Sequence, residues 1–168
     1  MTNSPTGRLE RTPGGGDLVV TRVFRAAVED VWASITEPER TARWFGPWEG
    51  EAAPGRTVKV QMAYEEGAPW MDFRIDVCEP PRRLALSSAG ESGGWHIELL
   101  LAHEDGRTEL SLVHHLETTD GVGDFGPGWE YYLDMLVAAR DGTTSPDFAD
   151  YYPAMKPYYE KLRTESER

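Results

Sequence analysis

The sequence predicts an α+β domain, in which an antiparallel sheet with one apolar face is covered by a long helix near the C-terminus. Several segments between residues 57 and 117 alternate apolar and polar side chains, which is the pattern of strands with one buried face and one wet face. Residues 126–142 instead place apolar side chains every three or four positions, which predicts an amphipathic helix. Because such a helix must bury its apolar side, we expect it to pack on the apolar face of the sheet.

Composition is typical of a soluble globular protein and disfavours several classes of partner. The 168 residues are 39% hydrophobic and 27% charged, and this length predicts one domain. The net charge of −12 argues against nucleic acid and anionic membranes as partners. Cys78 is the only cysteine, and the first 16 residues contain no apolar run like that of a signal peptide. We therefore expect a cytoplasmic protein without an internal disulfide.

The first 45 residues predict a strand followed by two short helices. Residues 17–24, "DLVVTRVF", favour the strand, whereas residues 1–16 are either a tail or an extra hairpin strand with the turn "TPGGG". One face of the first helix carries Val28, Val31, Trp32 and Ile35. Pro38 cannot continue that helix, but it suits the first turn of a second short helix that ends near Phe45.

Five more strands are expected in the middle of the chain, which makes a sheet of about six. Their sequences are "TVKVQMAY", "WMDFRIDV", "RRLALSS", "WHIELLLAH" and "RTELSLVHHLE", and the turn "GESGG" precedes the fourth of them. The alternation places on buried faces Val58, Val60, Met62, Tyr64, Met71, Phe73, Ile75, Val77, Trp95, Ile97, Leu99, Leu101, Leu110, Leu112, His114 and Leu116. Asp72, Arg74 and Asp76 alternate with one of these rows, so we expect them to face solvent.

The helix over 126–142 is the strongest helical signal in the chain. One face carries Trp129, Tyr132, Leu133, Leu136, Val137 and Arg140. Gly142 stands where a glycine that ends a helix is expected. Residues 143–168 are rich in tyrosine, and so much aromatic surface rarely stays in water. We expect this extension to pack on the domain or on a partner subunit, which leaves a homodimer open.

Four separated segments, "VEDVWASITEPERTARWFGP", "EPPRRLALS", "GRTELSLVHH" and "GPGWEYYLDMLVAA", resemble the START-like (SRPBCC) helix-grip superfamily in content and order. The resemblance is closest to bacterial single-domain proteins named for similarity to the activator of the Hsp90 ATPase, and it covers residues 17–142. It implies a curved antiparallel sheet wrapped around its C-terminal helix, with a cavity between them. Members bind apolar or amphipathic small molecules, and some are polyketide cyclases or aromatases. The family has no shared catalytic motif, and a few members act on a chaperone.

Twelve side chains are the candidates for lining such a cavity. They are Trp44, Phe45, Trp48, Met62, Tyr64, Phe73, Leu112, His114, Trp129, Tyr132, Leu133 and Leu136. The rings of "ARWFGPW" are either a rim that stacks on a ligand or a plug at the end of the cavity. Trp129 and Tyr132 are either core residues or ligand contacts.

Histidine is the residue type most able to add chemistry to this site. His114 is expected to point inward, where it either orients a ligand or acts as an acid or base, or is a hydrogen-bonded core residue. His115 is expected to face solvent, and an adjacent pair on opposite faces of a strand makes a poor metal site. No spacing of His, Cys, Asp and Glu resembles a zinc or iron site, so we expect neither a metal nor a cofactor.

The preferred hypothesis is a protein that binds an apolar or amphipathic small molecule in its cavity. An enzyme of cyclase, aromatase or hydrolytic type in the same cavity is the second hypothesis, although no nucleophile, base and orienting group occur together. The third hypothesis is a module that binds a protein partner, such as an Hsp90-type chaperone. No residue is assigned a catalytic role.

Overall fold

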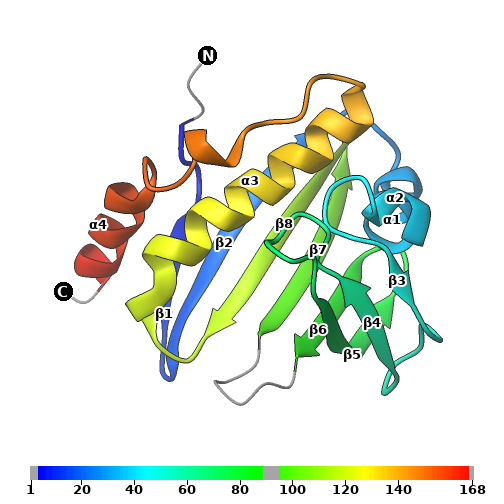
Figure 1. The fold of residues 1–168 in the computed structure, drawn as a ribbon, viewed down its shortest axis with the longest axis horizontal. Helices are drawn as coiled ribbons and strands as arrows, with labels where there is room; N and C mark the ends of the chain where they lie inside the picture. The colour runs from blue at the N-terminus through cyan, green and yellow to red at the C-terminus, as the bar shows by residue number, and fades with distance from the viewer. Residues whose placement is uncertain (1–3, 89–94, 167–168) are drawn as a thin grey trace. The chain divides into compact units, whose positions relative to one another are not determined.

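The computed structural model describes residues 4–88 and 95–166, and the expected turn "GESGG" at 90–94 lies outside the described residues. Eight strands are present within those ranges, and they belong to one sheet (Figure 1). They are β1 (Arg8–Thr12), β2 (Gly15–Phe24), β3 (Trp48–Glu49), β4 (Thr57–Gln61), β5 (Trp70–Glu79), β6 (Arg83–Ser88), β7 (His96–Glu104) and β8 (Arg107–Leu116).

The strand order is β1-β2-β8-β7-β6-β5-β4-β3. The neighbouring pairs β1–β2, β3–β4, β4–β5, β5–β6 and β6–β7 are antiparallel. The antiparallel sheet is thus confirmed, but the expected number of about six strands is wrong. The additional strands are β1 and β3. β3 has only two residues, which is too short to show an alternating pattern, and β1 precedes a glycine run that fits a tail equally well.

Four α-helices accompany the sheet within the described residues, which confirms the α+β class. They are α1 (Val28–Thr36), α2 (Pro38–Thr41), α3 (Val122–Asp141) and α4 (Lys156–Ser166), with short 3-10 turns η1 (Thr119–Gly121) and η2 (Phe148–Asp150). In the part of the chain that the structure describes, no helix combines the length and the apolar character needed to cross a membrane.

The chain divides into two compact units. The first unit joins the described parts of residues 1–21 and 112–168, and it contains β1, α3 and α4. The second unit is formed by the described parts of residues 22–111, and it contains α1, α2 and β3 to β7.

Helix α3 begins at Val122, four residues before the expected start, so Pro127 lies inside the helix. The sequence "GPG" normally indicates a helix break. Packing overrides that tendency here, because a Cβ atom on Gly126 would lie 2.5 Å from the ring of Tyr159 in the C-terminal segment. Only glycine allows this approach. The expected end of the helix is confirmed, since Gly142 adopts a left-handed conformation with φ of 68°.

Helix α3 buries two faces rather than one. The predicted face is buried at Trp129, Tyr132, Leu133 and Leu136, whereas Val137 and Arg140 are half-buried. A second buried row consists of Gly123, Gly126 and Glu130, and α4 packs beside α3 and β1 (Figure 1). Tyr151, Met155 and Tyr159 of the C-terminal segment are buried as well. This segment therefore belongs to the core of its unit.

In the second unit, β4 is shorter than the sequence pattern predicts. The strand ends at Gln61, so Met62 and Tyr64 lie beyond it in a turn. Met62 is still buried, but Tyr64 is 40% exposed, so the expected placement of Tyr64 on the buried face is wrong. The register of β5 also shifts between Ile75 and Val77, which leaves Val77 only half-buried.

Candidate functional site

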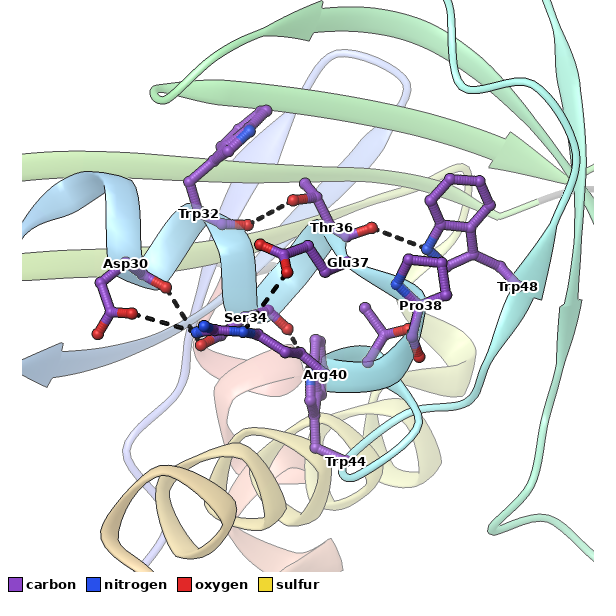
Figure 2. Close-up of polar contacts among 10 residues, drawn as sticks. Asp30, Trp32, Ser34, Thr36, Glu37, Pro38, Arg40, Trp44 and Trp48 are labelled. Atoms are coloured by element: carbon purple, nitrogen blue, oxygen red, sulfur yellow. Dashed lines mark hydrogen bonds and ion pairs between the residues drawn. The ribbon is translucent and has the colours of Figure 1, made fainter.

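The segment "ARWFGPW" closes the C-terminal end of helix α1. The last carbonyl groups of a helix have no partner within the helix. The indole N–H of Trp44 donates to the carbonyl oxygen of Ser34 at 2.9 Å, and the indole N–H of Trp48 donates to that of Thr36 at 2.8 Å (Figure 2). Both indoles therefore satisfy backbone acceptors of α1. This use of the two tryptophans has no local signal, because the partners lie ten and twelve residues away.

The turn after α2 holds these rings in one arrangement. α2 ends at Thr41 rather than near Phe45, and the backbone N–H groups of Phe45 and Gly46 both donate to the carbonyl oxygen of Thr41 at 2.8 Å. The hydroxyl of Thr41 donates to the carbonyl oxygen of Gly46 at 2.7 Å. A Cβ atom on Gly46 would collide with the carbonyl oxygen of Gln61, so only glycine fits.

Exposure differs among the three rings of the segment. Trp44 is 4% exposed, and its ring lies 5.5 Å from that of Phe45. Phe45 and Trp48 are half-buried. Burial of Trp44 and its bond to α1 favour the plug interpretation for this ring, while Phe45 and Trp48 retain surface that a ligand could contact.

Charged side chains on the surface join α2 to α1 next to this segment. Arg40 lies 3.1 Å from the carboxylate of Asp30 and 3.7 Å from that of Glu37 (Figure 2). All three side chains are about half exposed, so each pair contributes little to stability. The network has no group that points to catalysis.

In the first unit, His114 and Trp129 form a buried hydrogen-bonded pair. The indole N–H of Trp129 donates to Nδ1 of His114 at 3.0 Å. Trp129 is 4% exposed and His114 is 2% exposed. Because an indole nitrogen is only a donor, Nδ1 of His114 accepts, and the neutral ring carries its proton on Nε2. The inward position predicted for His114 agrees with its burial.

Aromatic rings surround this pair. The ring of Phe125 meets that of His114 edge-on at 4.7 Å, and the ring of Tyr132 lies 5.8 Å from that of Trp129. We call these four residues, His114, Phe125, Trp129 and Tyr132, the His114 cluster. Three members come from α3 and one comes from β8. The cluster combines apolar ring surface with one oriented polar group, which is the usual content of a small-molecule site.

The neighbouring His115 has a different environment. Its Nδ1 lies 2.7 Å from a carboxylate oxygen of Asp17, and its side chain is 40% exposed. The pairing with Asp17 joins residues 98 positions apart, so the sequence contained no signal for it. His115 is thus a partly exposed residue with a carboxylate partner rather than a purely solvated one.

The twelve candidate residues fall into both units. Those of the second unit are Trp44, Phe45, Trp48, Met62, Tyr64 and Phe73. Those of the first unit are Leu112, His114, Trp129, Tyr132, Leu133 and Leu136.

Tyr64 donates its hydroxyl hydrogen to the carbonyl oxygen of Ala42 at 2.8 Å, and partial burial raises the pKa of this tyrosine. Within residues 4–88 and 95–166, no group of three or more acidic, His or Cys side chains could hold a metal ion.

Sequence reasoning missed Glu130, a fully buried carboxylate on α3. It accepts hydrogen bonds from the hydroxyls of Thr6 and Tyr159, each at 2.7 Å, and from the backbone N–H groups of Thr6 and Gly7. Burial, and then the charge and hydrogen bond of Glu130, raise the pKa of Tyr159 well above its usual value. A possible signal was the row Gly123, Gly126 and Glu130, whose spacing marks a second packed face on the helix.

Comparison with known proteins identifies the family. A sequence model for the "Activator of Hsp90 ATPase homolog 1-like protein" family matches residues 25–140, most of the chain. The chain belongs to this family. The resemblance drawn from the four sequence segments is therefore confirmed, and so is the helix-grip class of fold with its large antiparallel sheet and long helix near the C-terminus. No curated protein matches the chain.

Solved structures share the fold over most of the chain. The crystal structure of CalU16 from Micromonospora echinospora is 26% identical with a TM-score of 0.76, covering 95% of this chain and 97% of that one. The Aha1 dimer from Colwellia psychrerythraea is 20% identical with a TM-score of 0.61, covering 73% of this chain and 94% of that one. DynU16, from the dynemicin biosynthetic locus, is 22% identical with a TM-score of 0.67, covering 79% of this chain and 50% of that one.

Proposed function

We propose that this member of the family binds an apolar or amphipathic small molecule through the His114 cluster. The observation that carries the proposal is the buried hydrogen bond between Trp129 and His114, beside the rings of Phe125 and Tyr132. A buried imidazole needs a partner, and here that partner also fixes the direction of the ring. The ring surfaces would supply affinity at about 25 cal/mol per Å² of apolar area removed from water. The imidazole of His114 would set the orientation of the ligand.

The geometry favours binding over acid–base catalysis at His114. The basic nitrogen of the neutral ring is Nδ1, and this atom already accepts the hydrogen bond of Trp129. To remove a proton from a substrate, His114 would have to break that bond or change its tautomer. A ring that is held in one direction can orient a ligand without either change. The remaining candidates stay proposed ligand contacts, Phe45 and Trp48 among them in the second unit, and Leu112, Leu133 and Leu136 in the first.

Native mass spectrometry tests this function directly. The protein is incubated with cell extract from its source organism, then transferred under gentle conditions, with heat-denatured protein as the control. We expect a discrete added mass that is lost on unfolding. The variant Trp129→Phe keeps an aromatic ring but lacks the N–H donor, so a smaller fraction of its molecules should carry the added mass. In the control Trp32→Phe on α1, this fraction should equal that of the parent. A chain that carries no added mass across several extracts would refute the proposal.

We also propose that the protein forms a homodimer through its tyrosine-rich segment. The matched Aha1 from Colwellia psychrerythraea is described as a dimer. In this chain, Phe148 is 45% exposed and its ring stacks on that of Tyr152 at 6.1 Å, which is apolar surface available to a second copy. Light scattering after gel filtration should give a dimer mass for the parent and a monomer mass for Phe148→Ser. A monomeric parent at high concentration would rule the dimer out.

A further inference from the structure

Two consecutive residues of α3 are held by different parts of the first unit. Neighbouring side chains on a helix point about 100° apart, so Trp129 and Glu130 leave the same turn in different directions. Trp129 meets His114 of β8, whereas Glu130 meets the N-terminal residues before β1 and the C-terminal helix α4. Any rotation of this turn that relaxes one set of contacts must disturb the other.

The contacts of Glu130 fix the rotation of the turn tightly. Its two carboxylate oxygens accept from the hydroxyl of Thr6 at 2.7 Å, the hydroxyl of Tyr159 at 2.7 Å and the backbone N–H of Gly7 at 3.3 Å. Hydrogen bonds to a carboxylate are stronger than neutral ones, and their geometry is narrow. These donors come from two segments, and Gly7 and Tyr159 are 152 residues apart in the chain, so the carboxylate joins the N-terminal residues to α4.

Close packing around this carboxylate leaves no room for adjustment. A Cβ atom on Gly126, one turn before Glu130, would lie 2.5 Å from the ring of Tyr159. A Cβ atom on Gly7 would collide with the hydroxyl of the same tyrosine. The backbone N–H of Gly7 also donates to that hydroxyl at 3.2 Å. Glu130, Tyr159 and Gly7 therefore form one rigid contact on the side of α3 that does not carry Trp129.

We propose that Glu130 is a positioning residue that holds the indole of Trp129 on Nδ1 of His114. A hydrogen bond of 3.0 Å weakens steeply when its angle changes, so a small rotation of the turn would release Nδ1. The proton of His114 could then occupy either ring nitrogen. Residues 6–7 and α4 thus determine which nitrogen of His114 presents a donor. A role of this coupling in ligand binding rests on the proposed function. The coupling between Glu130 and the Trp129–His114 hydrogen bond does not.

Nuclear magnetic resonance of the ring nitrogens tests the inference without any ligand. Long-range ¹H–¹⁵N correlation spectra distinguish a protonated from an unprotonated ring nitrogen. In the parent protein we expect a single form of His114 with the proton on Nε2. In Glu130→Gln, an amide N–H group faces the donors of Thr6 and Gly7, and we expect the His114 signals to shift toward a mixture of both tautomers.

A gentler variant keeps the test valid if Glu130→Gln does not fold. Tyr159→Phe removes one hydrogen bond to Glu130 and retains the ring that packs on Gly126, and it should cause a smaller shift in the same direction. The matched control is Asp134→Asn, which breaks another bond between α3 and the C-terminal segment, from the hydroxyl of Tyr151 at 2.7 Å. Because Asp134 lies more than one turn from Trp129, we expect it to leave the His114 signals unchanged.

Three results would overturn the inference. They are a parent His114 with its proton on Nδ1, folded Glu130 and Tyr159 variants whose His114 signals equal those of the parent, and an Asp134→Asn variant that shifts them as much as Glu130→Gln does. The last result would mean that any loosening of the C-terminal segment acts alike. Ligand retention is measured separately by native mass spectrometry. Altered His114 signals in a protein that retains no ligand would refute the proposed function and support the positioning role.

Discussion

Tyr159 donates its hydroxyl hydrogen to a carboxylate oxygen of Glu130 at 2.7 Å, and neither side chain is exposed to solvent. The bond joins α4 to α3, the two helices of the first unit that pack together. A buried carboxylate is stable only when donors surround it, so the donors of the N-terminal and C-terminal segments depend on one another. The tyrosine-rich extension is therefore a structural part of this unit.

Removing the Tyr159 hydroxyl should destabilise the protein measurably. Tyr159→Phe deletes a hydrogen bond to a charged group, for which the typical loss is about 1.5–3 kcal/mol of unfolding free energy. The midpoint of urea unfolding checks this value. The matched change Tyr158→Phe deletes a neutral bond, from that hydroxyl to the carbonyl oxygen of Gly7 at 2.8 Å, in a side chain that is 36% exposed. It should cost about 1 kcal/mol or less. Equal losses in the two variants would contradict the special role of Glu130.

Stability should fall at alkaline pH because of Tyr159. Its pKa is raised in the folded protein, mainly by burial and then by the charge of Glu130. Below about pH 10, both the folded and the unfolded chain keep the tyrosine proton. Above that pH the unfolded chain releases the proton and the folded chain does not, so the unfolding free energy decreases by up to about 1.4 kcal/mol per pH unit.

The comparison with Tyr159→Phe isolates this effect. The pKa values of Tyr64 and Tyr158 are also raised by burial, but both residues remain in the variant. Urea unfolding at a series of pH values should show a steeper alkaline decline for the parent than for the variant. Parallel declines would mean that Tyr159 does not keep its proton when folded.

Two glycines of α3 should respond in opposite ways to alanine. Gly126→Ala would bring a Cβ atom to 2.5 Å from the ring of Tyr159, so α4 must shift and the protein should lose stability. Gly128 has no atom within 4 Å of the same position. Gly128→Ala should therefore stabilise the helix by roughly 0.5–1 kcal/mol. Thermal unfolding of both variants checks the pair, and a destabilised Gly128→Ala would show that the helix has less space there than expected.

Local patterns were sufficient to predict the fold class, and long-range contacts explain what they missed. Alternation placed Phe73 and Leu112 on buried faces correctly, because period two reports burial directly. The end of α3 at Gly142 was equally predictable, since a left-handed residue favours glycine. The start of α3 was missed by four residues, because glycine and proline at 126–127 favour a helix boundary, whereas Gly126 packs against Tyr159 inside the helix.

In the candidate site, too, local patterns predicted burial, whereas long-range contacts were missed. The strand position of His114 predicted its burial, but nothing in the sequence marks its hydrogen bond with Trp129, which lies on another element. Glu130 was not singled out, because burial of a carboxylate depends on donors that only the folded chain assembles. Tyr64 was misplaced because the strand ended three residues earlier than the alternation did.

Comparing Trp48 with Trp70 should separate the capping of helix α1 from a general effect of removing an indole. Trp48→Phe removes the donor to the carbonyl oxygen of Thr36 at the end of α1, for a loss of about 0.5–1.5 kcal/mol locally. The backbone N–H of Glu37, which donates to the carbonyl oxygen of Ala33 at 2.9 Å, should then exchange with deuterium about two- to tenfold faster. Trp70, which is 48% exposed on β5, provides the control, and Trp70→Phe should leave this rate unchanged. An unchanged rate in Trp48→Phe would show that the "ARWFGPW" segment does not stabilise the end of α1 and would return Trp48 to the role of a ring available to a ligand.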